Sequence, residues 1–341
     1  MKIITFGELM LRLSPSGYKC LFQDPVLETS FCGAEANVAV ALSMYGKDTS
    51  FVTALPDNKV GRAARMELRK FGVGVSDIAN GGERLGIFFA EKGASQRPSD
   101  VIYDRKNSAI ACASPEDFDW ERIFDGADWF HFTGITPALS PQLAEICRHA
   151  AETAHSKGVT VSCDINYRGK LWNQQEACRV MTGIMPYVDV CIGNEEDAYK
   201  VFGIKAGETN VENGFIDRNG TERSARELSE KFGCRFVSFS QRLSYSASRN
   251  GWFGALYSAA DDAMYFSKEY DIDLVDRIGG GDAFAAGLIY GLHSGMCGQD
   301  AVEFAAASGC LDQTIEGDFC RFGAEEVRSL AAGNANGRIN R

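Results

Sequence analysis

The 341-residue sequence contains no apolar run close to the ~20 residues that a membrane-spanning helix needs. It also lacks an excess of positive charge, because 35 lysines and arginines face 46 aspartates and glutamates, for a net charge of −11 at pH 7. This balance argues against nucleic acid or a membrane surface as the main partner. It is compatible with a small anionic substrate, since a site can be locally basic.

Disulfide and metal-binding patterns are missing too. The eleven cysteines are odd in number, no two are spaced as Cys-x-x-Cys, and the four histidines do not cluster near them. Most cysteines sit in apolar runs, which is typical of reduced, buried thiols. The residues after Met1 do not form a basic stretch followed by an apolar one, as a secretory signal would. We therefore expect a cytoplasmic protein without a structural zinc site.

Common nucleotide-binding motifs are absent as well. The Gly-Lys pairs at residues 46–47 and 169–170 lack the Gly-x-x-x-x-Gly-Lys-Ser/Thr context, and no Gly-x-Gly-x-x-Gly follows the first expected strand. The protein-kinase motif set is missing. A nucleotide would therefore need another architecture.

Apolar runs of strand length alternate with helical patterns through most of the chain, which predicts an α/β fold with a mostly parallel sheet. Between about residues 84 and 112 the alternation stops, and two expected strands, 85–91 and 101–104, follow each other without a helix. Together with residues 9–13 they predict a small antiparallel sheet that acts as a lid. An excursion at the edge of the main sheet is the alternative, because periodicity does not separate the two.

The most distinctive stretch is Gly279-Gly280-Gly281-Asp282. A helical pattern follows it, with Phe284 and small residues on one face. Asp282 stands where an N-cap would stand, so a capped helix after a glycine turn is one interpretation. Three glycines also leave backbone N–H groups uncovered at a helix N-terminus, which favours an anion. We prefer a site that stabilises phosphate charge beside a carboxylate base.

Two motifs together suggest a family. Gly33-Ala34-x-x-Asn37 and Gly279-Gly280-Gly281-Asp282 resemble the two signatures of the ribokinase-like (PfkB) sugar kinases, and the resemblance extends from residue 3 to about residue 332. It implies a three-layer α/β/α core with a mostly parallel central sheet and a small β-strand lid. Residues 1–332 would form a single kinase domain, with lid strands from about 9–32 and 84–112. Residues 333–341 would be a polar tail.

Three further stretches resemble the 2-keto-3-deoxygluconate kinases within this family: residues 101–109, residues 164–168 and residues 314–319. The resemblance implies ATP-dependent phosphorylation of the terminal (C6) hydroxyl of 2-keto-3-deoxygluconate or a closely related keto-deoxy sugar acid. It also implies Mg²⁺, and a monovalent cation is compatible with it. Asp282 would accept the proton of the attacking hydroxyl, while Gly279, Gly280 and Gly281 would form an anion hole for the transferred group.

Arg105 and Arg168 point to a sugar acid, because a guanidinium binds a carboxylate with two parallel hydrogen bonds. Either arginine alone would more often be a solvated surface charge. Tyr103, two residues before Arg105 in an expected strand, would face the same side. The alternative for Asn37 is a helical side chain facing solvent. The predicted substrate-binding set comprises Gly33, Asn37, Phe88, Tyr103, Arg105, Arg168 and Asp282, with Phe88 standing where these kinases carry a tyrosine.

The nucleotide side departs most from the family. Asn194 and Asp197 correspond to an Asn-x-x-Glu element linked to Mg²⁺ and phosphate, but the shorter Asp197 favours contact with the metal through water. After the strand expected at residues 235–240, relatives carry a glycine-containing loop, whereas residues 240–246 contain no glycine. Ser240 and Arg242 would contact the nucleotide there, together with Asn194, Gly279 and Gly281.

Two other functions stay open. A neutral-sugar kinase of the fructokinase or ribokinase type would need no arginine clamp, and a non-catalytic sugar-binding protein would need no base. The lid strands also predict a homodimer, because exposed strand edges are commonly covered by a second copy.

Overall fold

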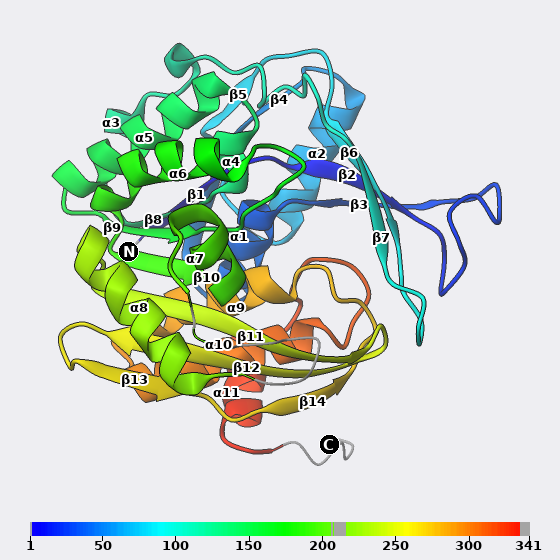
Figure 1. Ribbon diagram of the computed structural model, residues 1–341. Coiled ribbons are helices and arrows are strands. Elements are labelled where there is room, and N and C mark those ends of the chain that lie inside the picture. Colours follow the sequence, from blue (N-terminus) through cyan, green and yellow to red (C-terminus); the bar gives the residue numbers. More distant parts are fainter. Residues whose placement is uncertain (1, 206, 208–215, 335–341) are drawn as a thin grey trace.

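The computed structural model describes residues 2–205, 207 and 216–334. Within these residues, ten strands form one central sheet in the order β13-β12-β11-β10-β9-β8-β1-β4-β5, and β14 pairs with β12 (Figure 1). In this sheet order, all neighbouring strands from β11 to β5 pair in parallel. Strand β12 pairs antiparallel with each of its three neighbours, β11, β13 and β14. The strands are β1 (Lys2–Phe6), β4 (Asp48–Leu55), β5 (Ile78–Asn80), β8 (Ala127–Thr133), β9 (Thr160–Asp164), β10 (Val190–Gly193), β11 (Phe236–Ser246), β12 (Arg249–Ser258), β13 (Ala263–Phe266) and β14 (Tyr270–Asp273).

Helices cover both faces of this sheet, because side chains alternate along each strand and both faces are apolar. Ile4 packs into a cluster with α5 (Pro141–Ser156), α6 (Gln174–Ile184), α7 (Glu195–Phe202) and α8 (Arg218–Phe232). Ile3 packs into the opposite cluster with α1 (Ala34–Met44), α9 (Gly280–His293), α10 (Gly298–Asp312) and α11 (Ala324–Ala331). This confirms the three-layer α/β/α core. Of the predicted tail, residues 335–341 lie outside the described residues.

Four strands form a second sheet, which we call the lid. Its order is β3 (Glu28–Cys32), β2 (Met10–Ser14), β6 (Gly86–Glu91) and β7 (Asp100–Asp104), and it projects from the core in Figure 1. The lid is separate from the central sheet, so the edge-excursion alternative is wrong. The antiparallel prediction is also wrong in part. β2 runs parallel to β6, since the chain passes through the core between them, and β3 and β7 are antiparallel to their neighbours.

The far end of the lid touches the core. Between β6 and β7, the Ser95 N–H donates to Ser248 Oγ over 2.8 Å, and the Ala247 N–H donates to the Ser95 carbonyl over 2.8 Å. Lys92 and Glu316 form an ion pair of 2.5 Å. These contacts join the lid to the β11–β12 turn and to the segment after α10.

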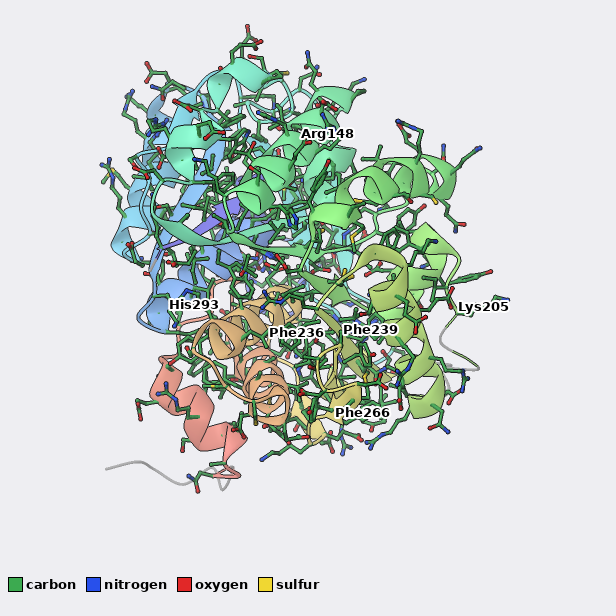
Figure 2. All side chains as sticks on the ribbon, turned by 90° about the vertical axis from the view of Figure 1, so that its left-hand side faces the viewer. Arg148, Lys205, Phe236, Phe239, Phe266 and His293 are labelled. Carbon is green, nitrogen blue, oxygen red and sulfur yellow. The ribbon has the colours of Figure 1, made fainter. Side chains whose placement is uncertain are left out.

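The stretch at residues 240–246 is strand, which corrects the expectation of a loop. β11 continues to Ser246 and pairs with β12 along its whole length, because β12 supplies an antiparallel partner. Figure 2 shows Phe236 and Phe239 of β11 among the side chains that fill the space between sheet and helices, whereas Lys205 lies at the rim. Helix α6 and strand β14 were not foreseen.

Each of the eleven cysteines lies in the described part of the chain and is free. This agrees with the prediction of reduced thiols. Along the same residues, the helices are too short or too polar to cross a membrane.

Candidate active site

A cleft of about 400 Å³ opens at the carboxyl ends of the parallel strands, below the lid. In open α/β sheets this edge is where ligands bind. The structure brings every site residue predicted from the sequence to this one cleft. Its lining includes Gly33, Asn37, Phe88, Tyr103, Arg105, Arg168, Asn194, Asp197, Ser240, Arg242, Gly279, Gly280, Gly281 and Asp282. Their roles in binding and catalysis stay predictions.

The glycine turn, Gly279 to Gly281, opens helix α9. Gly279 is the N-cap and has a left-handed φ of 100°, and an added Cβ there would lie 2.8 Å from the Asp318 carbonyl oxygen. An added Cβ on Gly280 would lie 2.8 Å from the Gln313 side chain, whereas one on Gly281 would meet nothing within 4 Å. Packing therefore requires the first two glycines. Gly281 leaves its backbone accessible from the cleft.

Asp282 lies in the first turn of α9, so its predicted position as the N-cap is wrong. Its carboxylate Oδ2 accepts a hydrogen bond from Asn37 Nδ2 over 2.6 Å. Burial raises the pKa of Asp282 well above its usual range, the Asn37 hydrogen bond opposes that rise, and the nearby Asp164 carboxylate adds to it. The Asn37 donor thus favours the ionised form that a general base needs.

Asn37 is buried, which excludes the alternative of a solvent-facing helical side chain. Its Oδ1 accepts from the Gly33 N–H over 3.1 Å, while its Nδ2 binds Asp282. Gly33 itself is required by packing, because an added Cβ would overlap the Glu8 carbonyl oxygen. The neighbouring backbone therefore requires a glycine here whether or not a sugar approaches it.

Arg105 is less free than the sequence suggested. Its Nε donates to Glu8 Oε2 over 2.7 Å, its Nη2 pairs with the same carboxylate, and Ser108 Oγ donates to Glu8 Oε1 over 2.5 Å. The guanidinium lies 5.3 Å from the centre of the Tyr103 ring, as the shared strand face predicts. Arg105 therefore lines the cleft with its charge already balanced.

Asp104 and Phe88 occupy the two faces of the lid near Arg105. Asp104 turns outward and pairs with Arg84 over 2.8 Å, so it does not weaken the positive charge inside the cleft. Phe88 is buried, and its ring centre lies 5.6 Å from that of Tyr103. An aromatic wall thus faces the cleft from the lid.

Arg168 follows β9 and is exposed at the cleft. Its side chain makes no hydrogen bond or ion pair with any residue that the structure describes. An unpaired guanidinium at the wall of a cleft can bind a carboxylate with two hydrogen bonds. Of the two predicted arginines, Arg168 is therefore the one available to an anionic substrate.

Asn194 caps α7, since its Oδ1 accepts from the Asp197 N–H over 2.8 Å. Asp197 is buried and accepts from the Tyr167 N–H over 3.1 Å. Burial raises the pKa of Asp197 to about 7, and the neighbouring Asp164, whose own pKa burial raises to about 6, contributes to that rise. No group of three or more metal-binding side chains forms among the described residues.

Two arginines stand at the end of the cleft beside the glycine turn. Ser240 and Arg242 lie on the same face of β11, and Arg277 approaches from the segment before the turn. Burial lowers the pKa of Arg277, and the nearby Arg242 charge lowers it further. Neither side chain forms an ion pair within the described chain, so this end of the cleft carries positive charge without a counterion.

Sequence reasoning missed Arg277, Glu8 and Glu35, all of which line the cleft. Glu8 had a usable signal, because it follows the first strand of a parallel sheet at its carboxyl end. Glu35 accepts hydrogen bonds from Thr133 and Thr136 over 2.7 Å, contacts between distant segments that no local pattern announces. Arg277 belongs to the glycine stretch itself, where the aspartate drew attention away from it.

The model of the pfkB family of carbohydrate kinases matches residues 1–317. The chain belongs to this family. It is therefore a carbohydrate kinase, a phosphotransferase with an alcohol group as acceptor.

Three relatives illustrate where this kinase stands among PfkB proteins. The crystal structure of a 2-dehydro-3-deoxygluconokinase from Thermotoga maritima is 49% identical, with a TM-score of 0.93 and 98% of each chain covered. The 2-dehydro-3-deoxygalactonokinase of Haloferax volcanii is 32% identical over 98% of each chain. The 2-dehydro-3-deoxygluconokinase of Bacillus subtilis is 28% identical over 92% of this kinase and 90% of the relative.

The buried Asp197 predicts a pH-dependent stability. With a pKa of about 7 when folded and 3.8 as the ordinary value, it keeps a proton on folding that the unfolded chain has released. The free energy of unfolding of the wild type should therefore fall, relative to Asp197→Asn, as the pH rises from about 4 to 7. The slope is at most roughly 1.4 kcal/mol per pH unit. Urea denaturation across this range measures it, with Glu196→Gln as an exposed control. A difference that does not change with pH would contradict the assignment.

Proposed function

We propose that this kinase transfers the γ-phosphoryl group of ATP to the terminal (C6) hydroxyl of 2-keto-3-deoxygluconate or a closely related keto-deoxy sugar acid. The observation that carries the proposal is the placement of the unpaired Arg168 in the same cleft as Asp282 and the glycine turn. The names of the relatives support it, since 2-dehydro and 2-keto describe the same group. They differ in the gluco or galacto form, so the proposal covers both.

The proposed step needs one base and one anion hole. The terminal hydroxyl oxygen forms a bond to the γ-phosphorus, the bond from that phosphorus to the bridging oxygen of ADP breaks, and Asp282 takes the hydroxyl proton. Backbone N–H groups at Gly279 to Gly281, at the positive end of α9, stabilise charge on the transferred group. Catalysis of phosphoryl transfer consists mostly of positioning and charge stabilisation, and the base and the anion hole are groups of the kind that provide both.

PfkB kinases use ATP with Mg²⁺. Mg²⁺ often keeps several waters and binds through few carboxylates together with substrate phosphates. The described residues form no group of three or more metal-binding side chains. They therefore fit a magnesium ion that is carried in by the phosphates of the nucleotide. Asp197 and Asp164 would contact it through water. Bound Mg²⁺ supplies neutralisation of phosphate charge. Arg242 and Arg277 would hold the phosphates from the other side, and Asn194 and Ser240 would line the nucleotide.

Replacing the base should abolish turnover without unfolding the protein. In Asp282→Asn the amide oxygen can still accept from Asn37, and a partly buried carboxylate disappears, so thermal unfolding should occur at or above the wild-type temperature. The rate should fall by roughly 10²- to 10⁴-fold. A coupled assay with ATP and 2-keto-3-deoxygluconate measures this. A rate within about threefold of the wild-type rate would contradict the assignment of Asp282 as the base.

The arginines separate a sugar acid from a neutral sugar. Arg168→Ala should raise KM for the sugar acid by on the order of 30-fold, about 2 kcal/mol for lost charged hydrogen bonds. KM for ATP should stay unchanged. Arg105→Ala also leaves Glu8 without its positively charged partner, so its effect mixes binding with local structure. Lys170→Ala, a nearby exposed charge, is the control. If Arg168→Ala leaves KM unchanged and fructose or ribose is the better substrate, the enzyme is a neutral-sugar kinase.

We also propose a homodimer through the lid. Tyr18, Phe22, Val26 and Ile102 are large apolar side chains exposed on the lid strands and the segment between β2 and β3. Both outer strands, β3 and β7, present free edges within the described chain. Light scattering at micromolar concentration should show twice the 37.2 kDa of one chain. Ile102→Glu should shift it to one chain, and Met66→Glu, exposed on α2 (Lys59–Lys70), should not. A monomeric wild type would contradict the proposal.

A further inference from the structure

Arg12 belongs to the lid strand β2, yet its side chain reaches out of the lid into the core. Its Nη2 donates to Asp276 Oδ2 over 2.6 Å, its Nη1 donates to Asp318, and its Nε donates to Ser14 Oγ over 2.8 Å. The side chain of Arg12 is 4% exposed, and those of Asp276 and Asp318 are 2% and 1% exposed. A buried ion network therefore crosses the boundary between lid and core.

Both aspartates that Arg12 binds also hold the glycine turn. Asp276 Oδ1 accepts a hydrogen bond from the Ile278 N–H over 3.2 Å, immediately before the turn. The Asp318 backbone packs against Gly279, where an added Cβ would lie 2.8 Å from its carbonyl oxygen. Arg12 is thus connected to the turn by two contacts, through Asp276 before Gly279 and through Asp318 at Gly279.

Arg12 also stands beside the aromatic wall of the cleft. In the parallel pairing of β2 with β6, Arg12 is opposite Phe88. Phe88 in turn packs against Tyr103, with 5.6 Å between the ring centres, and both residues line the cleft. A shift of this part of the lid would therefore move Arg12 as well.

Stability alone does not explain a guanidinium at this place. Buried ion pairs are often no more stabilising than apolar groups of similar shape. Asp276 and Asp318 lie near two more carboxyl groups, the partly buried Asp282 and the buried Asp312, and the Asp312 oxygens have no hydrogen-bond partner among the described residues. A planar guanidinium with fixed donors orients two carboxylates in such a crowded cluster. Orientation is the property that an apolar residue would not supply.

We propose that Arg12 is a positioning residue that makes the geometry of the glycine turn depend on the position of the lid. With a sugar held against Phe88 and Tyr103, Arg12 orients Asp276 and Asp318, and the turn presents its N–H groups to the transferred phosphoryl group. With the lid displaced, the turn loses this support. Binding of sugar and of ATP are then coupled through Arg12. This inference rests on the proposed phosphoryl transfer, but not on which sugar accepts the group.

The test compares the wild type with a charge-compensated variant that combines Arg12→Met, Asp276→Asn and Asp318→Asn. The three buried charges disappear together, and an asparagine Oδ1 can still accept from Ile278. Arg12→Lys serves as a second variant that keeps the charge but loses the planar fork. Arg84→Met is the matched control, because it removes an arginine just before lid strand β6 whose partner, Asp104, does not touch the turn.

Calorimetry measures the affinity for a non-hydrolysable ATP analogue with and without a saturating sugar that the wild type phosphorylates. We expect the sugar to tighten binding of the ATP analogue to the wild type by at least about fivefold. The ratio of the affinities with and without sugar should approach one in the compensated variant. The kcat should fall at least tenfold there, and the KM for ATP at saturating sugar should rise by about the factor that is lost from the ratio. Arg12→Lys should show the same direction, and Arg84→Met should retain the wild-type ratio and kcat.

Two results would overturn the inference. One is a wild-type ratio of one, and the other is an undiminished ratio and kcat in a folded compensated variant. If that variant does not fold, the same criteria apply to Arg12→Lys. If the wild type phosphorylates a neutral sugar instead of a sugar acid, the substrate proposal fails, and the coupling is measured with that neutral sugar.

Discussion

One hydrogen bond, from Asn37 to Asp282, joins residues 245 positions apart and fixes the geometry of the cleft. Asn37 lies on the helix that follows lid strand β3, and Asp282 lies on the helix that follows the glycine turn. Both helices direct their N-terminal turns toward the cleft, so the bond sets the distance between the sugar side and the phosphate side. It also favours the ionised carboxylate against the burial that raises its pKa.

The parts of the fold that the sequence predicted depend on local physics. Small residues at regular helical spacing indicated the packing face of α9, and Gly287 indeed lies against α10, where an added Cβ would be 2.8 Å from Ala305 Cα. Alternating strand and helix patterns indicated a parallel sheet, and parallel strands align their carboxyl ends. That alignment explains why residues as distant as Asn37 and Arg168 reach one cleft.

The parts that were wrong or missing depend on contacts between distant segments. Whether β2 runs parallel or antiparallel to β6 depends on the path of the chain through the core. The charge on Arg105 is balanced by Glu8, which lies 97 residues earlier. The N-cap of α9 is Gly279 and not Asp282, because the residue that adopts the left-handed conformation is selected by packing against Asp318.

The extension of β11 has a consequence for how such kinases are recognised. On a strand, only every second side chain faces the cleft, so Ser240 and Arg242 line it while Gln241 turns away and binds Thr221 over 3.0 Å. Which side chains line this part of the site therefore depends on the register in which β11 pairs with β12. A one-residue insertion before Ser240 would leave the sequence of residues 240–246 unchanged, but it would turn Ser240 and Arg242 away from the cleft and Gln241 towards it. A consensus pattern written for a glycine loop would not detect the site at all.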